Sequence, residues 1–214
     1  MKILKCGMFV IVSLFIGLIL FEFYCIQIAD SKTNSIKSTY LTDNELSLKD
    51  VPKTWLEILL KVEDPNFRNH KGIDFSTHGA GLTTITQGLA KFMYFESFKP
   101  GFAKIEQTLI ARFVINDHFS KDEQLEILIN HVYLGHFNGE RVTGFSEASH
   151  VYFGKSFLDL TESEYISLVA MFIGPNAFNV IKQSKKNKLR VERIKDFLNG
   201  KYIPKYLSDT YYNG

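Results

Sequence analysis

The sequence lacks several of the patterns that mark common classes of binding site. Its two cysteines, Cys6 and Cys25, form no CxxC pair, and its six histidines form no HExxH motif, so neither a zinc site nor a redox-active thiol pair is predicted. The formal net charge of +2 is close to neutral, so a nucleic-acid partner is not indicated. No internal repeat and no strand-rich region is visible in the 214 residues. The remaining patterns predict a mainly α-helical protein.

Charge is also missing from a long stretch near the N-terminus. Residues 1–6 carry two lysines, residues 7–21 carry no charge, and the apolar character continues past Glu22 to residue 28. This length suits one transmembrane helix, and lysines before it favour a cytoplasmic N-terminus with the rest of the chain outside. A cleaved signal peptide is the alternative, but its apolar core is shorter and small residues mark its cleavage site. We therefore predict a signal-anchor helix over 7–28.

The rest of the chain divides into three parts. Residues 29–50 are rich in Ser, Thr, Asn and Lys, which is typical of a linker. Residues 51–198 are predicted to form the folded domain, because the chain is long enough for one domain with a core and too short for two enzyme modules plus an anchor. Residues 199–214 are predicted to be a loosely held C-terminal tail.

A pair of acidic residues follows the first predicted helix of this domain. Pro52 opens the helix, which runs over 53–62, and Glu63 and Asp64 stand at its C-terminal end, where the helix dipole disfavours negative charge. Two adjacent carboxylates in this position are costly, which is typical of active sites. A solvated acidic helix end is the alternative interpretation.

A threonine-rich turn comes next in the chain. Thr83 and Thr84 are natural N-caps for a helix that runs to Lys91. Free N–H groups at a helix N-terminus, together with hydroxyl groups, can hold phosphate oxygens, and Lys91 would lie two turns along, within reach of the same anion. A capped helix with a surface lysine is the simpler interpretation, and this segment alone does not distinguish the two.

Two other segments each allow two interpretations. The aromatic stretch 92–102, interrupted by Pro and Gly, suits either a buried loop or a loop that dips into the outer leaflet of a membrane. The basic run 182–195 suits either a solvated helix face or a face toward anionic lipid. Further helices, two of them with N-caps at Ser120 and Thr161, are predicted over 104–115, 121–134, 144–154 and 161–172.

Taken in order, the motifs between residues 52 and 180 resemble those of the peptidoglycan glycosyltransferases related to the lysozyme fold. That family includes the glycan-polymerising domains of class A penicillin-binding proteins and the monofunctional transglycosylases. Its first, second, fourth and fifth motifs are similar to Glu63-Asp64-x-x-Phe67-x-x-His70-x-Gly72, Gly81-Leu82-Thr83-Thr84-Ile85-Thr86-Gln87, Lys121-x-x-x-Leu125-Glu126-x-x-x-Asn130-x-x-Tyr133-x-Gly135 and Gly144-x-x-x-Ala148-x-x-x-Tyr152-Phe153-Gly154-Lys155. The second motif departs from the family at Thr83, where Ser is usual, and at Gly88, where a second Gln is usual.

The resemblance implies a mainly α, lysozyme-like domain and a definite reaction. A monofunctional hexosyltransferase of this kind polymerises lipid-linked disaccharide-peptide (lipid II) into glycan strands by inverting transfer, with release of the lipid diphosphate. Glu63 is by resemblance the general base, and burial beside Asp64 would raise its pKa toward the working range of a base. The substrate-binding residues that the resemblance implies are Asp64, Phe67, His70, Gly72, Thr83, Thr84, Thr86, Gln87, Lys91, Lys104, Glu126 and Asn130.

The family's second catalytic carboxylate belongs to its third motif, Arg-Lys-x-x-Glu, which this sequence matches poorly. Read locally, the carboxylate is Glu106. Counted back without gaps from Ser120, the family's Glu falls on Thr108 and its Arg on Lys104. The two readings differ by two residues, about 200° around a helix. We predict that Glu106 is the second catalytic residue, and the alternative is that this carboxylate is missing.

The resemblance also implies a location and partners. The catalytic domain is expected on the outer, periplasmic side of a bacterial cytoplasmic membrane, held by a single span in contact with membrane lipid. Expected partners are lipid II, the growing lipid-linked glycan and other cell-wall synthesis proteins, including a separate transpeptidase, with no nucleic acid. No cofactor is expected to be required, although some family members respond to divalent metal, so Mg²⁺ or Mn²⁺ remains open.

Three functions are compatible with the sequence. The first is an active glycan polymerase. The second is a catalytically weak relative that binds lipid-linked substrate or a cell-wall partner. The third is a hydrolase on the same lysozyme-like scaffold.

Overall fold

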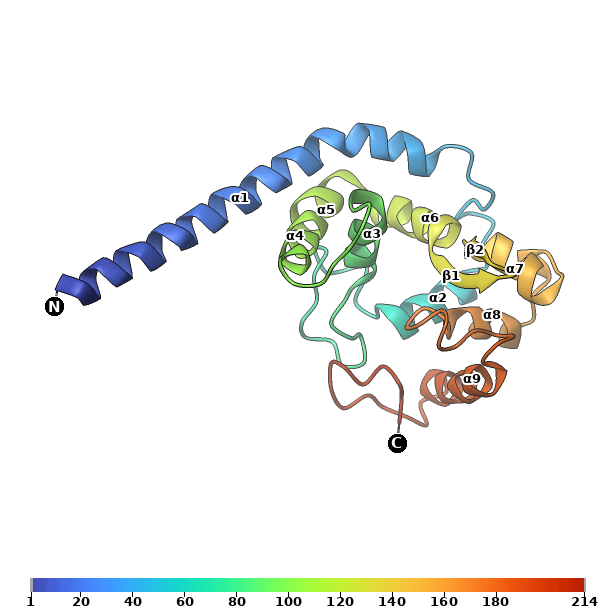
Figure 1. Ribbon diagram of the computed structural model, residues 1–214. Helices are drawn as coiled ribbons and strands as arrows, with labels where there is room; N and C mark the ends of the chain where they lie inside the picture. The colour runs from blue at the N-terminus through green and yellow to red at the C-terminus, as the bar shows by residue number, and fades with distance from the viewer. Residues whose placement is uncertain (1, 214) are drawn as a thin grey trace.

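The computed structural model describes residues 2–213 and is mainly α-helical, as predicted (Figure 1). A long N-terminal helix extends away from a domain built from shorter helices and one small hairpin. In chain order the elements are α1 (Lys2–Leu41), α2 (Lys53–Glu63), α3 (Ile85–Tyr94), α4 (Phe102–Ile110), the π-helical turn η1 (Ala111–Ile115), α5 (Asn116–His118), α6 (Lys121–His131), β1 (Tyr133–Phe137), β2 (Glu140–Thr143), α7 (Phe145–Phe153), the 3-10 turn η2 (Phe157–Asp159), α8 (Glu162–Val169) and α9 (Ser184–Leu198).

Three of the predicted helix starts are capping boxes. Thr84, Ser120 and Thr161 each accept a hydrogen bond from the backbone N–H three residues on, and the Gln or Glu at that position bonds back to the cap. Each box satisfies two N–H groups that the first turn of a helix leaves without a partner. These local signals fix where α3, α6 and α8 begin.

The core of the domain lies where α2 and α7 both pack against α8. Trp55 stacks on Tyr165 with ring centroids 4.5 Å apart, and the Tyr165 hydroxyl donates to the Trp55 carbonyl at 2.8 Å. Phe145 packs against Tyr165 from α7, and Leu59 is fully buried one turn after Trp55. The apolar face of α2 therefore holds the end of this helix, and Glu63 with it, in a fixed place.

The predicted helix over 121–134 ends earlier than expected. α6 stops at His131, and Tyr133 begins an antiparallel hairpin in which His136 pairs with Arg141. Gly135, which we expected to end the helix, lies inside β1 with φ +101, a value that L side chains rarely adopt. This hairpin was not predicted, because its two short strands are stabilised by pairing with each other rather than by a local signal.

The segment predicted as a linker is instead largely helical, because α1 continues to Leu41. Its polar side chains contact the domain: Thr33 and the Tyr94 hydroxyl are 3.1 Å apart, the Tyr40 hydroxyl donates to the Phe92 carbonyl at 3.1 Å, and Lys37 pairs with Glu123 at 2.9 Å. The N-terminal half of α1 exposes apolar side chains and extends from the domain (Figure 1). By length and composition, residues 7–41 include a helix able to cross a membrane.

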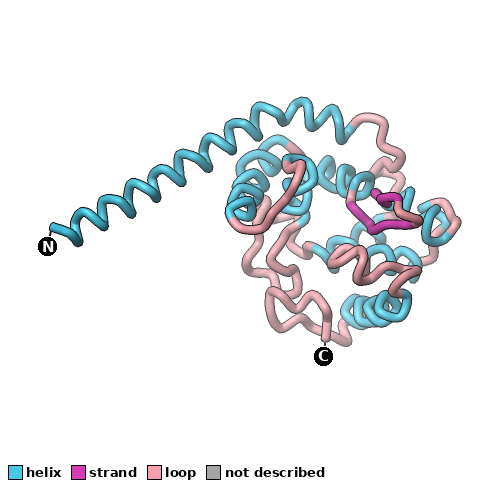
Figure 2. The backbone as a smooth tube through the Cα atoms, in the orientation of Figure 1, coloured by secondary structure: helices cyan, strands magenta, loops and turns pink. Residues whose placement is uncertain are grey.

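The C-terminal tail also differs from the prediction. The Tyr212 side chain is only 3% exposed, stacks on Phe197 with centroids 4.5 Å apart and donates a hydrogen bond to the Val62 carbonyl at 3.0 Å. The tail runs beside the loop between α2 and α3, where Gly79 donates to the Tyr206 carbonyl at 2.8 Å (Figure 2). An aromatic anchor therefore holds a segment that has no regular secondary structure.

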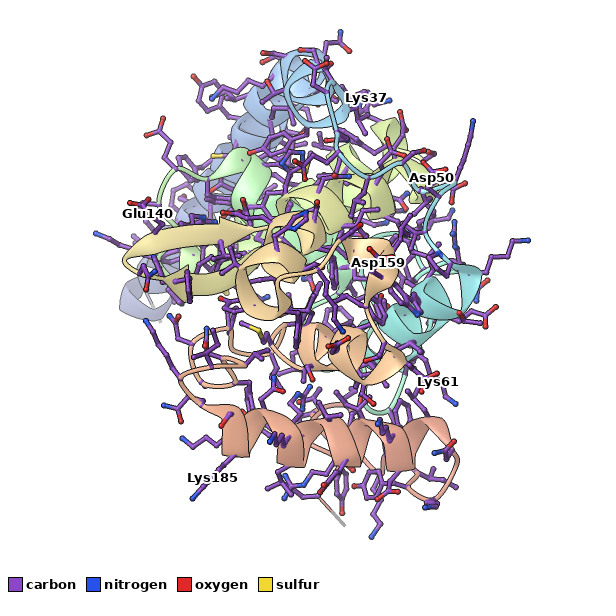
Figure 3. All side chains as sticks on the ribbon, turned by 90° about the vertical axis from the view of Figure 1, so that its right-hand side faces the viewer. Lys37, Asp50, Lys61, Glu140, Asp159 and Lys185 are labelled. Carbon is purple, nitrogen blue, oxygen red and sulfur yellow. The ribbon has the colours of Figure 1, made fainter. Side chains whose placement is uncertain are left out.

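The basic helix α9 presents two different faces. Lys185 points away from the domain, as a solvated helix face predicts (Figure 3). On the opposite face Asn187, Arg190, Val191 and Ile194 are buried at helical spacing against the domain.

We predict that Tyr212→Ala lowers the free energy of unfolding by about 3–5 kcal/mol, because it leaves a cavity and an unpaired Val62 carbonyl. Tyr206, whose side chain is 70% exposed in the same tail, provides the matched control, and Tyr206→Ala should change stability by no more than about 0.5 kcal/mol. Denaturant unfolding in detergent measures both. Equal effects of the two substitutions would show that the tail does not pack as described.

Candidate active site

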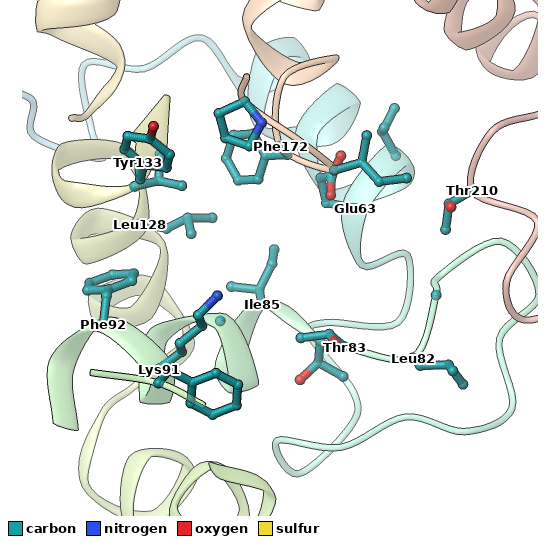
Figure 4. Close-up of a pocket in the computed structure, with 18 of the residues that line it drawn as sticks. Glu63, Leu82, Thr83, Ile85, Lys91, Phe92, Leu128, Tyr133, Phe172 and Thr210 are labelled. Atoms are coloured by element: carbon teal, nitrogen blue, oxygen red, sulfur yellow. The ribbon is translucent and has the colours of Figure 1, made fainter. Parts of the chain in front are cut away.

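A cavity of about 870 Å³ opens between the end of α2, the start of α3, the hairpin and the loop after α8 (Figure 4). Glu63 lies on one wall, and Thr83, Thr84 and Lys91 lie on the wall formed by α3. Figure 4 shows Leu128 and Phe172 among the apolar side chains that complete the lining. The cavity is thus largely apolar, with a small number of charged and hydroxyl groups, as ligand sites commonly are.

Glu63 is the last residue of α2, and its carboxyl group is unusual. Its Oε1 atom is buried and has no hydrogen-bond partner among the residues that the structure describes. Burial raises the pKa of Glu63 to about 7, with Arg190 acting to lower it and Asp64 acting to raise it further. A carboxylate that titrates near neutral pH and is free of protein partners is suited to accept a proton from a bound molecule.

The neighbouring Asp64 does not line the cavity and has a structural role. It is fully buried and accepts hydrogen bonds from His70 Nε2, at 2.9 and 3.0 Å to its two oxygens, and from the Ile85 backbone N–H at 2.9 Å. His70 Nδ1 accepts from the Gly72 N–H at 3.0 Å, so the proton of a neutral ring lies on Nε2. Asp64 therefore joins the end of α2 to the first turn of α3.

The other residues of the first motif pack behind Asp64, together with Lys121 from α6. Phe67 is fully buried, and Lys121 Nζ lies 4.3 Å from the centre of its ring. Burial lowers the pKa of Lys121 to about 8, while Asp64 acts to raise it. Gly72 has φ +86, and a Cβ atom there would overlap the Ala111 carbonyl oxygen. None of the three lines the cavity, so the structure places them behind the site rather than in it.

The second motif divides between the cavity and the core. Thr83 faces the cavity, and Lys104 Nζ from α4 donates to its hydroxyl at 3.0 Å. Burial and the nearby Lys91 both lower the pKa of Lys104. By contrast, Thr86 is buried and donates to Gln124 at 2.8 Å, and Gln87 completes the capping box of α3. The Thr83 hydroxyl and Lys91 therefore line the same cavity as Glu63, and the Lys104 amine is bonded to that hydroxyl.

Glu106 is not where we predicted it. It does not line the cavity, and it lies on the side of α4 that faces α1, close enough to Glu22 and Cys25 to interact with them electrostatically. Thr108, the position that the ungapped register gives, faces α3 instead and accepts a hydrogen bond from Gln87 Nε2 at 2.9 Å, but it does not line the cavity either. The two positions point in different directions because they are two residues apart on a helix.

Glu126 and Asn130 also lie outside the cavity. Glu126 accepts a hydrogen bond from the Leu48 N–H at 3.1 Å, and Asn130 accepts from the Leu46 N–H at 3.0 Å and donates to its carbonyl at 2.8 Å. These two residues hold the chain that leads from α1 into α2. The structure therefore places them in the framework of the domain, outside the cavity that Glu63 lines.

Sequence reasoning missed a buried arginine in the site. Arg190 of α9 is 3% exposed, lines the cavity and donates to the carbonyls of Ala170 at 3.1 Å and Thr210 at 2.7 Å. The basic run was interpreted as a surface feature. The available signal was the helical spacing of Arg190 with Val191 and Ile194, which puts the arginine on the apolar face.

Comparisons with known proteins agree on one family. Residues 31–199 match the family model described as Transglycosylase. The chain is 34% identical over 187 residues to penicillin-binding protein 1F of Bacillus subtilis, which covers 81% of this chain and 26% of that protein. It is 32% identical over 158 residues to penicillin-binding protein 1A of Neisseria gonorrhoeae, which covers 68% of this chain and 19% of that protein. The chain thus spans about a quarter or less of the curated relatives it matches.

The raised pKa of Glu63 has a consequence for stability. A folded-state pKa of about 7 lies above the ordinary value of 4.5, so stability present below pH 4.5 is lost as the pH rises to 7. Glu63→Gln removes this loss. We therefore expect the free energy of unfolding of Glu63→Gln, relative to that of the wild type, to increase by about 1–3 kcal/mol as the pH rises from 5 to 8. Denaturant unfolding at both pH values measures the gain, and an identical difference at pH 5 and pH 8 would contradict a perturbed Glu63.

Proposed function

The chain belongs to the transglycosylase family, the peptidoglycan glycosyltransferases, and from that premise we propose that it polymerises lipid-linked disaccharide-peptide into glycan strands. The observation that carries the proposal is the position of Glu63. Its unpartnered carboxylate, with a pKa of about 7, faces the same cavity as the hydroxyl and amine groups at the start of α3. A base and an anion-binding group on two walls of one cavity are what glycosyl transfer from a diphosphate requires.

In the proposed reaction Glu63 removes the proton from the acceptor's sugar hydroxyl. That oxygen forms a bond to the donor's anomeric carbon while the bond from this carbon to the diphosphate oxygen breaks. The bonding electrons leave with the lipid diphosphate, and a single displacement inverts the anomeric centre. Glu63 must be ionised to act, so kcat/KM is expected to rise with pH to about 7 and then level off.

The proposed leaving group is held where positive charge is already concentrated. Lys91 and Lys104 lie close enough for Lys91 to lower the pKa of Lys104, and Lys104 also bonds to Thr83. A diphosphate between them would relieve the repulsion between the two amines and gain charge-assisted hydrogen bonds. Because its negative charge grows as the bond breaks, these groups stabilise the transition state more than the ground state.

We also propose that α1 anchors the protein in the cytoplasmic membrane with the domain on the outer side. α1 is long and apolar enough to cross a membrane, and α4, packed beside it (Figure 1), exposes Phe102 and Ile105. These apolar side chains suit contact with the lipid around the substrate's own anchor.

The proposed reaction uses no protein-bound cofactor. In the part of the chain that the structure describes, no three His, Cys, Asp or Glu side chains gather as a metal site. Mg²⁺ or Mn²⁺, where it stimulates the reaction, would then be bound mainly by the oxygens of the substrate's diphosphate, as Mg²⁺ commonly is.

One observation favours a second candidate function, that of a catalytically weak relative that binds lipid-linked substrate. In the ungapped register Thr108, not a glutamate, stands at the family's second carboxylate position, and Glu106 of the local register does not line the cavity. Thr108 uses its hydroxyl proton to bond to the Lys104 carbonyl at 2.7 Å, so it is not available as an acid. A slow enzyme and a pure binding protein both fit this feature, and they differ in whether polymer forms.

The first test compares two glutamates. Purified protein in detergent is given lipid-linked disaccharide-peptide, and glycan products are separated by gel electrophoresis. We expect Glu63→Gln to lower polymer formation by at least about a hundredfold, the contribution of a general base. Glu106→Gln is the matched control and is expected to keep most of the activity, because Glu106 lies outside the cavity.

The outcomes of this test separate the candidates. Wild-type polymer that disappears only with Glu63→Gln supports the polymerase. Substrate binding with no polymer from the wild type supports the binding protein, and shortening of existing glycan would point to a hydrolase. Loss of polymer with Glu106→Gln alone would overturn the assignment of the site.

The second test concerns the diphosphate. Lys91→Gln is expected to raise KM for the lipid-linked substrate about tenfold or more, because a charge-assisted hydrogen bond to the diphosphate is lost. Lys99, an exposed lysine in the loop that follows α3, does not line the cavity and is the control. Steady-state kinetics measure both variants, and equal KM values for Lys91→Gln and wild type would place the diphosphate elsewhere.

A further inference from the structure

Besides Lys91 and Arg190, a third cationic side chain lines the cavity, and it comes from the hairpin. Arg141 of β2 and Tyr133 of β1 both line the cavity, and the Arg141 guanidinium lies 4.7 Å from the centre of the Tyr133 ring. Figure 4 shows Tyr133 and Thr83 at opposite corners of the cavity, with Leu128 near Tyr133. The arginine therefore stands on a different wall from the groups assigned to the leaving diphosphate.

Contacts from two segments fix the ring on which Arg141 lies. The Tyr133 hydroxyl forms hydrogen bonds with His136 Nδ1 at 2.6 Å and with Asn176 Oδ1 at 3.3 Å. His136 is also the residue of β1 that pairs with Arg141 in the hairpin register. A guanidinium over an aromatic ring is attracted by the face of the ring, and this attraction leaves its N–H groups available to a ligand. The Tyr133 ring therefore favours a position of Arg141 at the hairpin wall.

Within the described residues, the donors of Arg141 are free of hydrogen bonds, as are those of Lys91, the lysine that lines the same cavity. Among residues 7–213 the guanidinium forms no ion pair and no hydrogen bond with another side chain or carbonyl. Arg190, by contrast, donates to two backbone carbonyls, and Lys104 donates to Thr83. An arginine that is held by stacking and has unused donors is suited to bind a planar or tetrahedral oxyanion through two parallel hydrogen bonds.

We propose that Arg141 binds an oxyanion of the lipid-linked substrate at the hairpin wall, separate from the diphosphate that leaves. This inference rests on the proposed function. A disaccharide-peptide carries carboxylates on its peptide, and the second substrate molecule in the cavity carries its own diphosphate. Both are oxyanions that a guanidinium recognises in the same way. Arg141 is accordingly a specificity-determining residue that sets how tightly the substrate binds at this wall, with Glu63 left to perform the proton transfer.

The test compares Arg141→Gln with Arg112→Gln. Arg112 is the matched control, because its guanidinium lies 5.0 Å from the centre of the Phe113 ring, also as an arginine–aromatic pair, but outside the cavity. We expect Arg141→Gln to raise KM for lipid-linked disaccharide-pentapeptide roughly tenfold, with kcat changed less than twofold. Arg141→Lys keeps the charge without the planar guanidinium, so its KM should lie between those of the wild type and Arg141→Gln. Thermal unfolding of each variant shows that the fold is intact.

One further substrate identifies which oxyanion is bound. With the peptide carboxylates converted to amides, the diphosphate remains. If Arg141→Gln and wild type then have equal KM values, the ligand is a carboxylate, whereas a persisting tenfold difference identifies the second diphosphate. Unchanged KM with the unmodified substrate, or an equal rise in Arg112→Gln, overturns the proposal.

Failure of this proposal can be told apart from failure of the proposed function. Equilibrium binding of the same substrate is measured in the Glu63→Gln background, with and without Arg141→Gln. If the wild type makes no polymer, catalysis is excluded, but weaker binding in the double variant still supports Arg141. If the wild type polymerises and the double variant binds as tightly as Glu63→Gln alone, only the assignment of Arg141 fails.

Discussion

The buried carboxylate of Asp64 is the interaction on which the site depends. It accepts from His70 and from the backbone N–H of Ile85, so one side chain fixes the end of α2 relative to the beginning of α3. Glu63 is next to Asp64 in the chain, and Thr84 is next to Ile85. The distance between the proposed base and the proposed anion site is therefore set by a contact that lies outside the cavity. Breaking a buried network of this kind costs more than its exposed equivalent, because each partner is left unsatisfied in a low-dielectric interior.

Much of the fold could be predicted because its signals are local. The capping boxes at Thr84, Ser120 and Thr161 are written in four consecutive residues each, and the apolar spacing of α2 follows its helical period. The hairpin and the C-terminal tail could not be predicted in this way. Tyr212 is held by Phe197 and by the carbonyl of Val62, and no property of the tail sequence names these distant partners. Extended structure is stabilised by such non-local contacts.

The site shows the same division. Glu63 and the turn at Thr83 were found from their motifs, and both face the cavity. The motifs could not separate residues that face the cavity from residues that hold others in place. Asp64 and Gln87 match their motifs as well as Glu63 does, yet their side chains form hydrogen bonds within the framework of the domain. For Glu106 the sequence allowed two registers, and the contacts show that Glu106 faces α1 whereas Thr108 faces α3. A difference of two residues decides which face of a helix carries the carboxylate.

The unbroken course of α1 has a geometric consequence. Residues 28–41 rise by roughly 20 Å as a helix, and their contacts through Thr33 and Tyr40 lock the domain to this rod. A domain mounted in this way cannot swing as it would on a flexible tether. In the proposed anchored state, the height of the cavity above the bilayer is nearly constant. A lipid-linked ligand in the same bilayer would then reach Glu63 by lateral diffusion alone. Neither partner would have to move along the membrane normal, because the helix holds the cavity at a fixed height.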